Sequence, residues 1–132
     1  MKNKLTDIIV RGYHLDGYAH VNNARYLEFL EEARWQYFDY IPAEWYKTSG
    51  LAFVIVNINI NYKFSATFGD VLSVETEVEK IGNTSMVFSQ KVALKNSSKA
   101  VCDAKITFVI LNTKTGKPVK IEGDLLKLLK GK

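Results

Sequence analysis

Cysteine, proline and long apolar runs are all scarce in this chain of 132 residues. A single cysteine, Cys102, excludes an intrachain disulfide, and its place in a strand-like run predicts a small buried side chain. No apolar run approaches the roughly 20 residues of a membrane-spanning helix, and the opening MKNKLTD lacks the apolar core of a signal peptide. We therefore expect a cytoplasmic protein with no membrane span.

An excess of charge of one sign is also missing. The 18 Lys and Arg residues and 14 Asp and Glu residues are scattered and give a net charge of +4. Because no basic stripe is interleaved with aromatic residues, nucleic acid is not an expected partner, whereas a ligand carrying phosphates remains compatible with this charge. The two histidines, His14 and His20, have no standard metal-ligand spacing, so we predict no metal and no redox cofactor.

The length predicts one domain over residues 1–132. A strand is expected near residues 6–11, followed by a polar loop over 14–23. A helix is then expected over 23–40, with Pro42 just beyond its end. Its apolar positions form a broad helical stripe: Tyr26, Leu27, Phe29, Leu30, Ala33, Tyr37 and Phe38.

After Gly50 the apolar period changes from 3.6 to 2, which predicts a long strand over 52–62 with strict alternation of its faces. Three asparagines on one of these faces, at 57, 59 and 61, suggest a face turned to a neighbouring subunit or a polar tunnel. Further strands over 70–81, 85–95 and 99–112 and a helix over 124–130 complete the pattern. It predicts an α+β fold, with an antiparallel sheet curled around one long central helix.

The loop before the long helix carries the side chains that suggest chemistry: His14, Asp16, His20, Asn22 and Asn23. A helix start offers unpaired N–H groups and partial positive charge, which can hold a carbonyl and the oxyanion formed when it is attacked. Asp16 could be the base or the nucleophile. His20 could orient the loop or polarise the carbonyl, and either asparagine could cap the helix or donate its amide to substrate.

The pattern D-x3-H-V-N-N-x2-Y from Asp16 to Tyr26, followed by E-E-A-R at 31–34 and the long strand, resembles the hotdog-fold acyl-CoA thioesterases. Within this 4-hydroxybenzoyl-CoA thioesterase-like superfamily, the bacterial long-chain (thioesterase III) subgroup is most similar. The resemblance implies hydrolysis of long-chain fatty acyl-CoA to fatty acid and CoA, with Asp16 catalytic. It also implies oxyanion donors between His20 and Asn23, and a homodimer or homotetramer with sites at the interface.

The resemblance further assigns Lys63 to the CoA phosphates, and Tyr26 is expected in the core or the pocket wall. Three positions depart from the family pattern: His14 replaces a frequent Asp, Ala19 a frequent Gly, and Ser65 a frequent Pro.

Alternative functions are an acyl-ACP thioesterase, a hotdog hydratase or dehydratase, and a non-catalytic acyl-CoA binder. Because the acid Asp16 precedes the helix, dehydration is disfavoured. Replacement of Asp16 would separate the binder from the enzymes.

Overall fold

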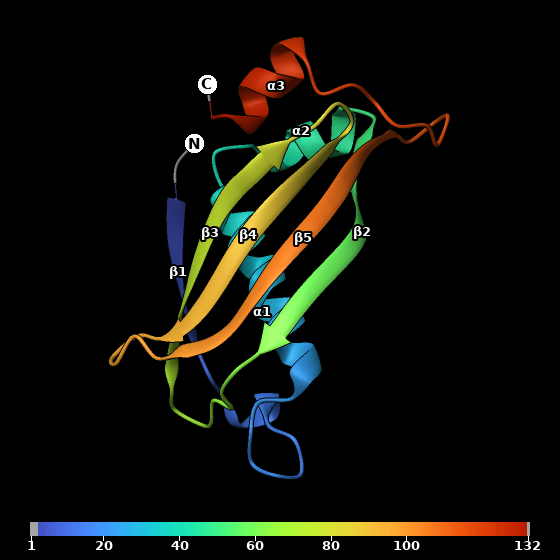
Figure 1. Cartoon of the computed structure of the whole chain (residues 1–132). Helices are drawn as coiled ribbons and strands as arrows, with labels where there is room; N and C mark the ends of the chain where they lie inside the picture. Colours follow the sequence, from blue (N-terminus) through green and yellow to red (C-terminus); the bar gives the residue numbers. More distant parts are fainter. Residues whose placement is uncertain (1–2, 132) are drawn as a thin grey trace.

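The computed structural model of the chain describes residues 3–131. Five strands form one antiparallel sheet in the order β1-β3-β4-β5-β2 (Figure 1). The elements, in chain order, are β1 Asn3–Ile9, a 3-10 turn Gly12–His14, α1 Asn23–Tyr37, α2 Ala43–Thr48, β2 Leu51–Tyr62, β3 Val71–Ile81, β4 Ser85–Leu94, β5 Ala100–Asn112 and α3 Gly123–Leu129.

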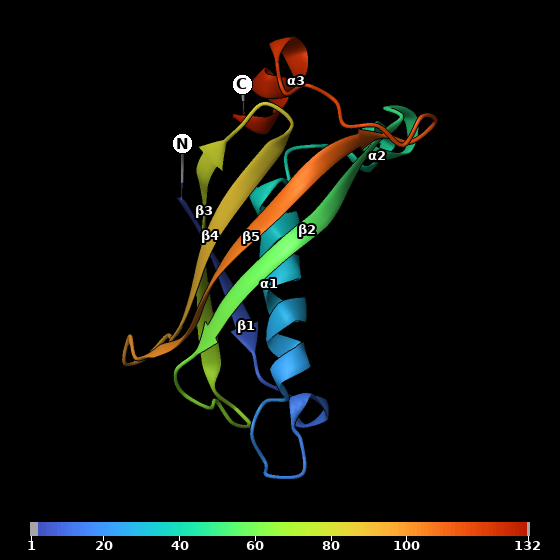
Figure 2. The same ribbon diagram turned by 45° about the vertical axis from the view of Figure 1, so that its right-hand side comes forward.

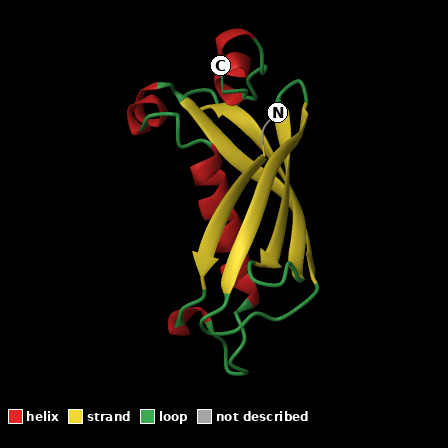
Figure 3. Cartoon of the chain, turned by 90° about the vertical axis from the view of Figure 1, so that its left-hand side faces the viewer, coloured by secondary structure: helices red, strands yellow, loops and turns green. Residues whose placement is uncertain are grey.

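The sheet curls around α1, which runs along its inner face (Figures 2 and 3). Every second residue of the central strands points at this helix and is buried, so the core lies between the sheet and α1. Its sheet side is formed by Leu72, Val74, Val78, Met86, Phe88, Val92, Ala104, Ile106, Phe108 and Ile110. The predicted α+β fold, with an antiparallel sheet around one long helix, is confirmed.

Helix α1 begins where the sequence indicated and ends earlier. Asn22 is the N-cap, and its side-chain oxygen accepts a hydrogen bond from the Ala24 N–H at 3.0 Å, an interaction typically worth about 1 kcal/mol. The helix ends at Tyr37 rather than at residue 40. Leu27, which was predicted to belong to the apolar stripe, is 37% exposed.

The connection expected over residues 41–50 contains a helix that the sequence did not predict. Pro42 is the N-cap of this short helix, α2. The rings of Trp45 and Tyr46 lie 6.0 and 6.1 Å from the ring of Phe53 on β2. Two aromatic side chains of α2 therefore cover one end of the sheet.

Strand β2 does not alternate regularly along its whole length. Ile55 pairs with Phe108 and Asn57 with Thr107, so Val56 has no partner on β5 and forms a β-bulge. Because the bulge absorbs one residue, Phe53 and Ile55 share the inner face with residues 58, 60 and 62. The strict alternation predicted from the sequence is wrong at this point.

The three asparagines of β2 lie on the outer face of the sheet. They pair with Thr107, Lys105 and Asp103 of β5 and are exposed. The predicted polar tunnel is therefore wrong for this chain, because this face points away from α1. A neighbouring subunit on this face stays a prediction.

Two predictions made from scarce residue types can be compared with the structure. Cys102 is 1% exposed, and burial, with a smaller effect of Asp103, raises the pKa of its thiol to about 12. Among residues 3–131, no helix is both long and apolar enough to cross a membrane.

Candidate active site

The loop between the 3-10 turn and α1 is a closed turn that projects beyond the end of the sheet (Figure 2). Leu15 and Val21 form a β-bridge across its base. Above the bridge, the Asp16 N–H donates to the His20 carbonyl at 2.8 Å, and the Ala19 N–H donates to the Asp16 carbonyl at 3.1 Å. Backbone hydrogen bonds thus hold the position of Asp16 relative to the helix start.

The carboxylate of Asp16 is exposed and only half used by the protein. Its Oδ1 accepts hydrogen bonds from the N–H groups of Tyr18 at 2.8 Å and His20 at 3.3 Å. Within residues 3–131, no donor reaches its Oδ2. One oxygen therefore fixes the orientation of the side chain, and the other is available to water or substrate.

The first turn of α1 leaves a backbone donor available beside this loop. The Ala24 N–H is used by the Asn22 side chain, and the Arg25 N–H donates to the Asn22 carbonyl at 2.8 Å. In the described part of the chain, the Asn23 N–H has no protein acceptor. The helix dipole adds partial positive charge there, so this position can stabilise a carbonyl oxygen that becomes negative.

The two histidines have different surroundings. His14 Nδ1 accepts a hydrogen bond from the Arg11 N–H at 2.8 Å, and its ring meets Phe29 edge-on. Burial lowers the pKa of His14, and the nearby Arg25 lowers it further. His20 is exposed, and no side-chain hydrogen bond is formed by its imidazole within residues 3–131.

Ala19 adopts a left-handed backbone conformation, with φ of 62°. Its carbonyl accepts a hydrogen bond from Thr67 Oγ1 at 2.9 Å, which ties the loop to the segment after β2. Glycine adopts this conformation without a steric cost. The backbone geometry thus explains why glycine is frequent at this position in the family pattern.

Tyr26 and Lys63 are both engaged by other residues of this chain. Tyr26 is 2% exposed; its hydroxyl oxygen accepts a hydrogen bond from the Ala66 N–H at 3.1 Å, and burial raises the pKa of the phenol. Lys63 Nζ forms an ion pair with Asp103 at 2.7 Å. The hydrogen bonds from Lys63 and Asn61 lower the pKa of Asp103. Substrate binding by Tyr26 or Lys63 stays a prediction.

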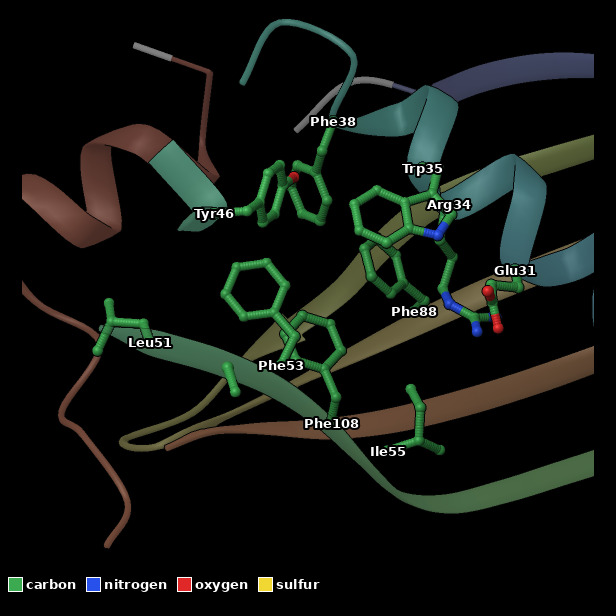
Figure 4. Close-up of a pocket in the computed structure, with 11 residues that line it drawn as sticks. Glu31, Arg34, Trp35, Phe38, Tyr46, Leu51, Phe53, Ile55, Phe88 and Phe108 are labelled. Atoms are coloured by element: carbon green, nitrogen blue, oxygen red, sulfur yellow. The ribbon is translucent and has the colours of Figure 1, made fainter. Parts of the chain in front are cut away.

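A pocket of about 320 Å³ lies between α1, α2 and β2 (Figure 4). It is lined by Glu31, Arg34, Trp35, Phe38, Tyr46, Leu51, Ala52, Phe53, Ile55, Phe88 and Phe108. Its walls are mostly aromatic and aliphatic, which suits a hydrocarbon chain. Glu31, the first pocket residue of α1, follows Asn23 by eight residues, so the pocket begins about 12 Å along α1 from the helix start of the same chain.

The polar group in this pocket was not identified from the sequence. Glu28 pairs with Arg25 at 2.8 Å, three residues earlier on the helix. Glu31 precedes Arg34 at the same spacing, but Arg34 Nη1 donates to Gln90 Oε1 at 3.0 Å. The sequence did contain a sign that Gln90 is unusual. It is the one polar residue among the alternate, inward-facing residues of β4.

No group of three or more metal-ligating side chains occurs among the described residues. The site therefore consists of a carboxylate loop, a helix start and an apolar pocket. Together with a curled antiparallel sheet around one helix, these are the parts of a hotdog-fold thioesterase.

The family model of the thioesterase-like superfamily matches residues 10–129. The chain is 46% identical to the long-chain acyl-CoA thioesterase FadM of Escherichia coli, over 94% of this chain and 95% of that protein. It belongs to the thioesterase-like superfamily and is thus an enzyme of the thioesterase class.

Solved structures agree with this assignment. A probable thioesterase from Escherichia coli, YbaW, is 46% identical and superposes with a TM-score of 0.86, covering 96% of both chains. A 4-hydroxybenzoyl-CoA thioesterase is 19% identical, has a TM-score of 0.87 and covers 98% of this chain and 99% of that one. At this identity the second similarity concerns the fold alone.

Proposed function

We propose that this protein hydrolyses long-chain fatty acyl-CoA thioesters to free fatty acid and CoA. The observation that carries the proposal is the open Oδ2 of Asp16 in the loop that leads into α1, where the Asn23 N–H is available. The aromatic pocket suits a fatty acyl chain, and the Escherichia coli relative bears the name of a long-chain acyl-CoA thioesterase.

In the proposed mechanism, the thioester carbonyl accepts a hydrogen bond from the Asn23 N–H. Asp16 Oδ2 either takes a proton from a water molecule that attacks the carbonyl carbon, or attacks that carbon itself. If water attacks, breaking the C–S bond gives the fatty acid, and Asp16 passes the proton it took from water to the departing CoA thiolate. If Asp16 attacks, breaking the C–S bond leaves the acyl group on Asp16 as a mixed anhydride. A water molecule then hydrolyses the anhydride to the fatty acid and the free carboxylate, and a proton from that water goes to the CoA thiolate. Because a thioester is already activated, positioning and oxyanion stabilisation supply much of what the reaction needs.

The other predicted residues have supporting roles in this proposal. Asn22 caps the helix and keeps its first turn in place. His20 contributes its backbone N–H to the orientation of Asp16, and its exposed imidazole faces solvent where substrate would arrive. Lys63 and the buried Tyr26 are proposed to help hold the CoA moiety and the pocket wall.

The proposal includes a homodimer joined through β2. This twelve-residue strand forms one edge of the sheet, and it exposes apolar side chains at residues 54, 55, 56, 58 and 62. A long apolar edge strand with unpaired backbone groups is a template for another strand. Antiparallel pairing with the β2 of a second copy would satisfy these groups by a two-fold symmetric contact.

Such a dimer also brings the two parts of the site together. Within one chain, the end of β2 contacts the start of α1, because Tyr62 Oη donates to the Asn23 carbonyl at 3.3 Å. The start of β2 contacts the end of α1, where the rings of Phe38 and Phe53 lie 6.2 Å apart. Antiparallel pairing would therefore set the catalytic loop of one protomer beside the pocket of the other.

A panel of saturated acyl-CoA thioesters tests the proposed function, with release of the CoA thiol as the readout. Hydrolysis of long-chain members supports the proposal, and no hydrolysis of any member would contradict it. The same substrates on acyl carrier protein test the acyl-ACP alternative. A cytoplasmic location is part of the proposal and is compatible with a single, buried thiol.

A further inference from the structure

The pocket between α1, α2 and β2 has a polar end that hydrocarbon binding does not require. Phe53, Phe88 and Phe108 form its centre, whereas Glu31 and Arg34 lie together at one end (Figure 4). Arg34 is half-buried against these apolar walls, and a guanidinium there loses solvation free energy unless its N–H donors find acceptors. The substrate class proposed above therefore leaves the function of this pair open.

The position of Arg34 is fixed by a buried amide. Gln90 is fully buried, and its Nε2 donates to the Leu30 carbonyl at 3.0 Å and to Thr76 Oγ1 at 2.9 Å. Because both amide hydrogens are used, its Oε1 faces α1 and accepts from Arg34 Nη1 at 3.0 Å. The guanidinium is held in place by an amide that cannot turn.

Most of the donors of Arg34 are left without a protein acceptor. A guanidinium has five N–H donors, and among residues 3–131 only the hydrogen bond to Gln90 is formed. Burial lowers the pKa of Arg34, while Glu31 acts in the opposite direction. Arg34 lines a pocket whose walls are mostly aromatic and aliphatic, so an acceptor brought by a ligand to the remaining donors would be bound strongly.

Glu31 determines which kind of acceptor fits. Both side chains lie at the same end of the pocket (Figure 4), and the charge of Glu31 acts on Arg34, but the ion pairs of the described residues do not include Glu31 with Arg34. A ligand group that reaches both side chains meets a donor and an acceptor. A hydroxyl can accept from Arg34 and donate to Glu31, a ketone can only accept, and a carboxylate is repelled by Glu31.

We propose that Glu31 and Arg34 make the pocket selective for acyl chains that carry a hydroxyl group. The proposal rests on the proposed function, because it names the substrate class of the same enzyme. Gln90 acts as a positioning residue, since it holds Arg34 without touching the ligand.

The test compares stearoyl-CoA with its hydroxylated counterparts, which carry the hydroxyl on the third, tenth, twelfth or terminal carbon. One of them should exceed stearoyl-CoA about tenfold in kcat/KM, the factor of one charge-assisted hydrogen bond net of desolvation. In Arg34→Met this ratio should fall to about one. The exposed Lys47 of α2 follows the pocket residue Tyr46, so Lys47→Met is the matched loss of a nearby charge and should keep the ratio.

Glu31→Ala provides a second variant, because Glu31 is exposed and its loss leaves the core intact. The hydroxyl preference should fall in this variant. A further substrate, a stearoyl-CoA analogue whose last carbon is a carboxylate, should be hydrolysed faster relative to stearoyl-CoA than by the wild type, because the repulsion from Glu31 is gone. No preference for any hydroxyl position, or a preference that survives Glu31→Ala and Arg34→Met, would overturn the proposal.

Binding provides a readout that does not depend on turnover. Trp35 lines the pocket, so its fluorescence can follow titration of the wild-type protein with free stearic acid and with free hydroxystearic acids. If no CoA thioester is hydrolysed, the proposed function fails, and this titration still decides the selectivity. Tighter binding of one hydroxystearic acid that is lost in Arg34→Met supports it, and equal binding refutes it.

Discussion

The hydroxyl of Tyr62, the last residue of β2, donates a hydrogen bond to the carbonyl oxygen of Asn23 in the first turn of α1. The ring of Tyr62 also lies 5.7 Å from that of Tyr26 on the same helix. The edge strand and the helix start are thereby joined directly. Any partner that binds along β2 therefore contacts the strand that supports the candidate oxyanion donor.

Replacement of Asp16 by Asn should lower kcat by about two to four orders of magnitude, the range of a lost general base. The amide oxygen can still accept from the N–H groups of Tyr18 and His20, so the loop should keep its conformation. Thiol release measures the rate, and circular dichroism checks the fold. Turnover near that of the wild type would exclude the proposed role of Asp16.

The wild-type protein should sediment as a dimer or a larger assembly at micromolar concentration. Val56 is 56% exposed on the β2 edge, and Val56→Lys should shift the mass toward the monomer, because a charge on an edge strand opposes its pairing with another strand. Leu5 is 66% exposed on β1, the other edge of the sheet. Leu5→Lys is the matched control and should leave the mass unchanged; a monomeric wild type would contradict the prediction.

The catalytic efficiency should rise with acyl chain length. Each buried methylene contributes about 0.8 kcal/mol, so four methylenes in the aromatic pocket contribute roughly 3 kcal/mol, on the order of a hundredfold in kcat/KM. The measurement uses saturated acyl-CoAs below their micelle-forming concentrations. A flat or falling trend would mean that the aromatic side chains only fill the core, and the long-chain assignment would be lost.

Mixed dimers should regain activity that neither parent has. Asp16→Asn removes the carboxylate, and Ala52→Trp fills the pocket, so each homodimer should be inactive on long chains. If the loop of one protomer serves the pocket of its partner, the heterodimer contains one intact site and should work at about half the wild-type rate. The heterodimer is purified through a different tag on each protomer. If it shows no recovered activity, the loop and the pocket of one site belong to the same chain.

The stability of the loop that carries Asp16 should respond to residue 19. Ala19→Gly relieves the positive φ but adds entropy to the unfolded chain, so the free energy of unfolding should change by about 0 to +1 kcal/mol. Ala19→Val should lower it by more than about 1 kcal/mol, because a β-branched side chain fits this conformation poorly. Urea unfolding measures both; a Val variant as stable as the wild type would argue against the loop geometry.

The main elements could be predicted because their patterns are local. The 3.6-residue stripe and the two asparagines able to cap it marked the start of α1, and the ends of β3, β4 and β5 were predicted to within one residue. Helix α2 was missed because six residues with two aromatic side chains show no helical stripe. The end of α1 was misplaced because Phe38 continues the apolar pattern while its backbone has already left the helix.

The site divides in the same way. Asp16 and the helix start are neighbours in sequence, so their proximity could be predicted. Arg34 and Gln90 are 56 positions apart, and no local pattern shows which strand residue meets which turn of a helix. The inward position of Gln90 in β4 marked it as unusual, but only the packing of α1 on the sheet identifies its partner.

The bulge at Val56 makes β2 one residue longer than its partner strand requires. Deletion of Val56 would leave all remaining residues of β2 opposite their present neighbours on β5, whereas deletion of Ile58 with the bulge kept would turn the last residues of the strand over. In an alignment of this chain with a relative that lacks the bulge, the gap belongs at Val56. A gap placed elsewhere would equate inward residues with outward ones between that gap and Val56.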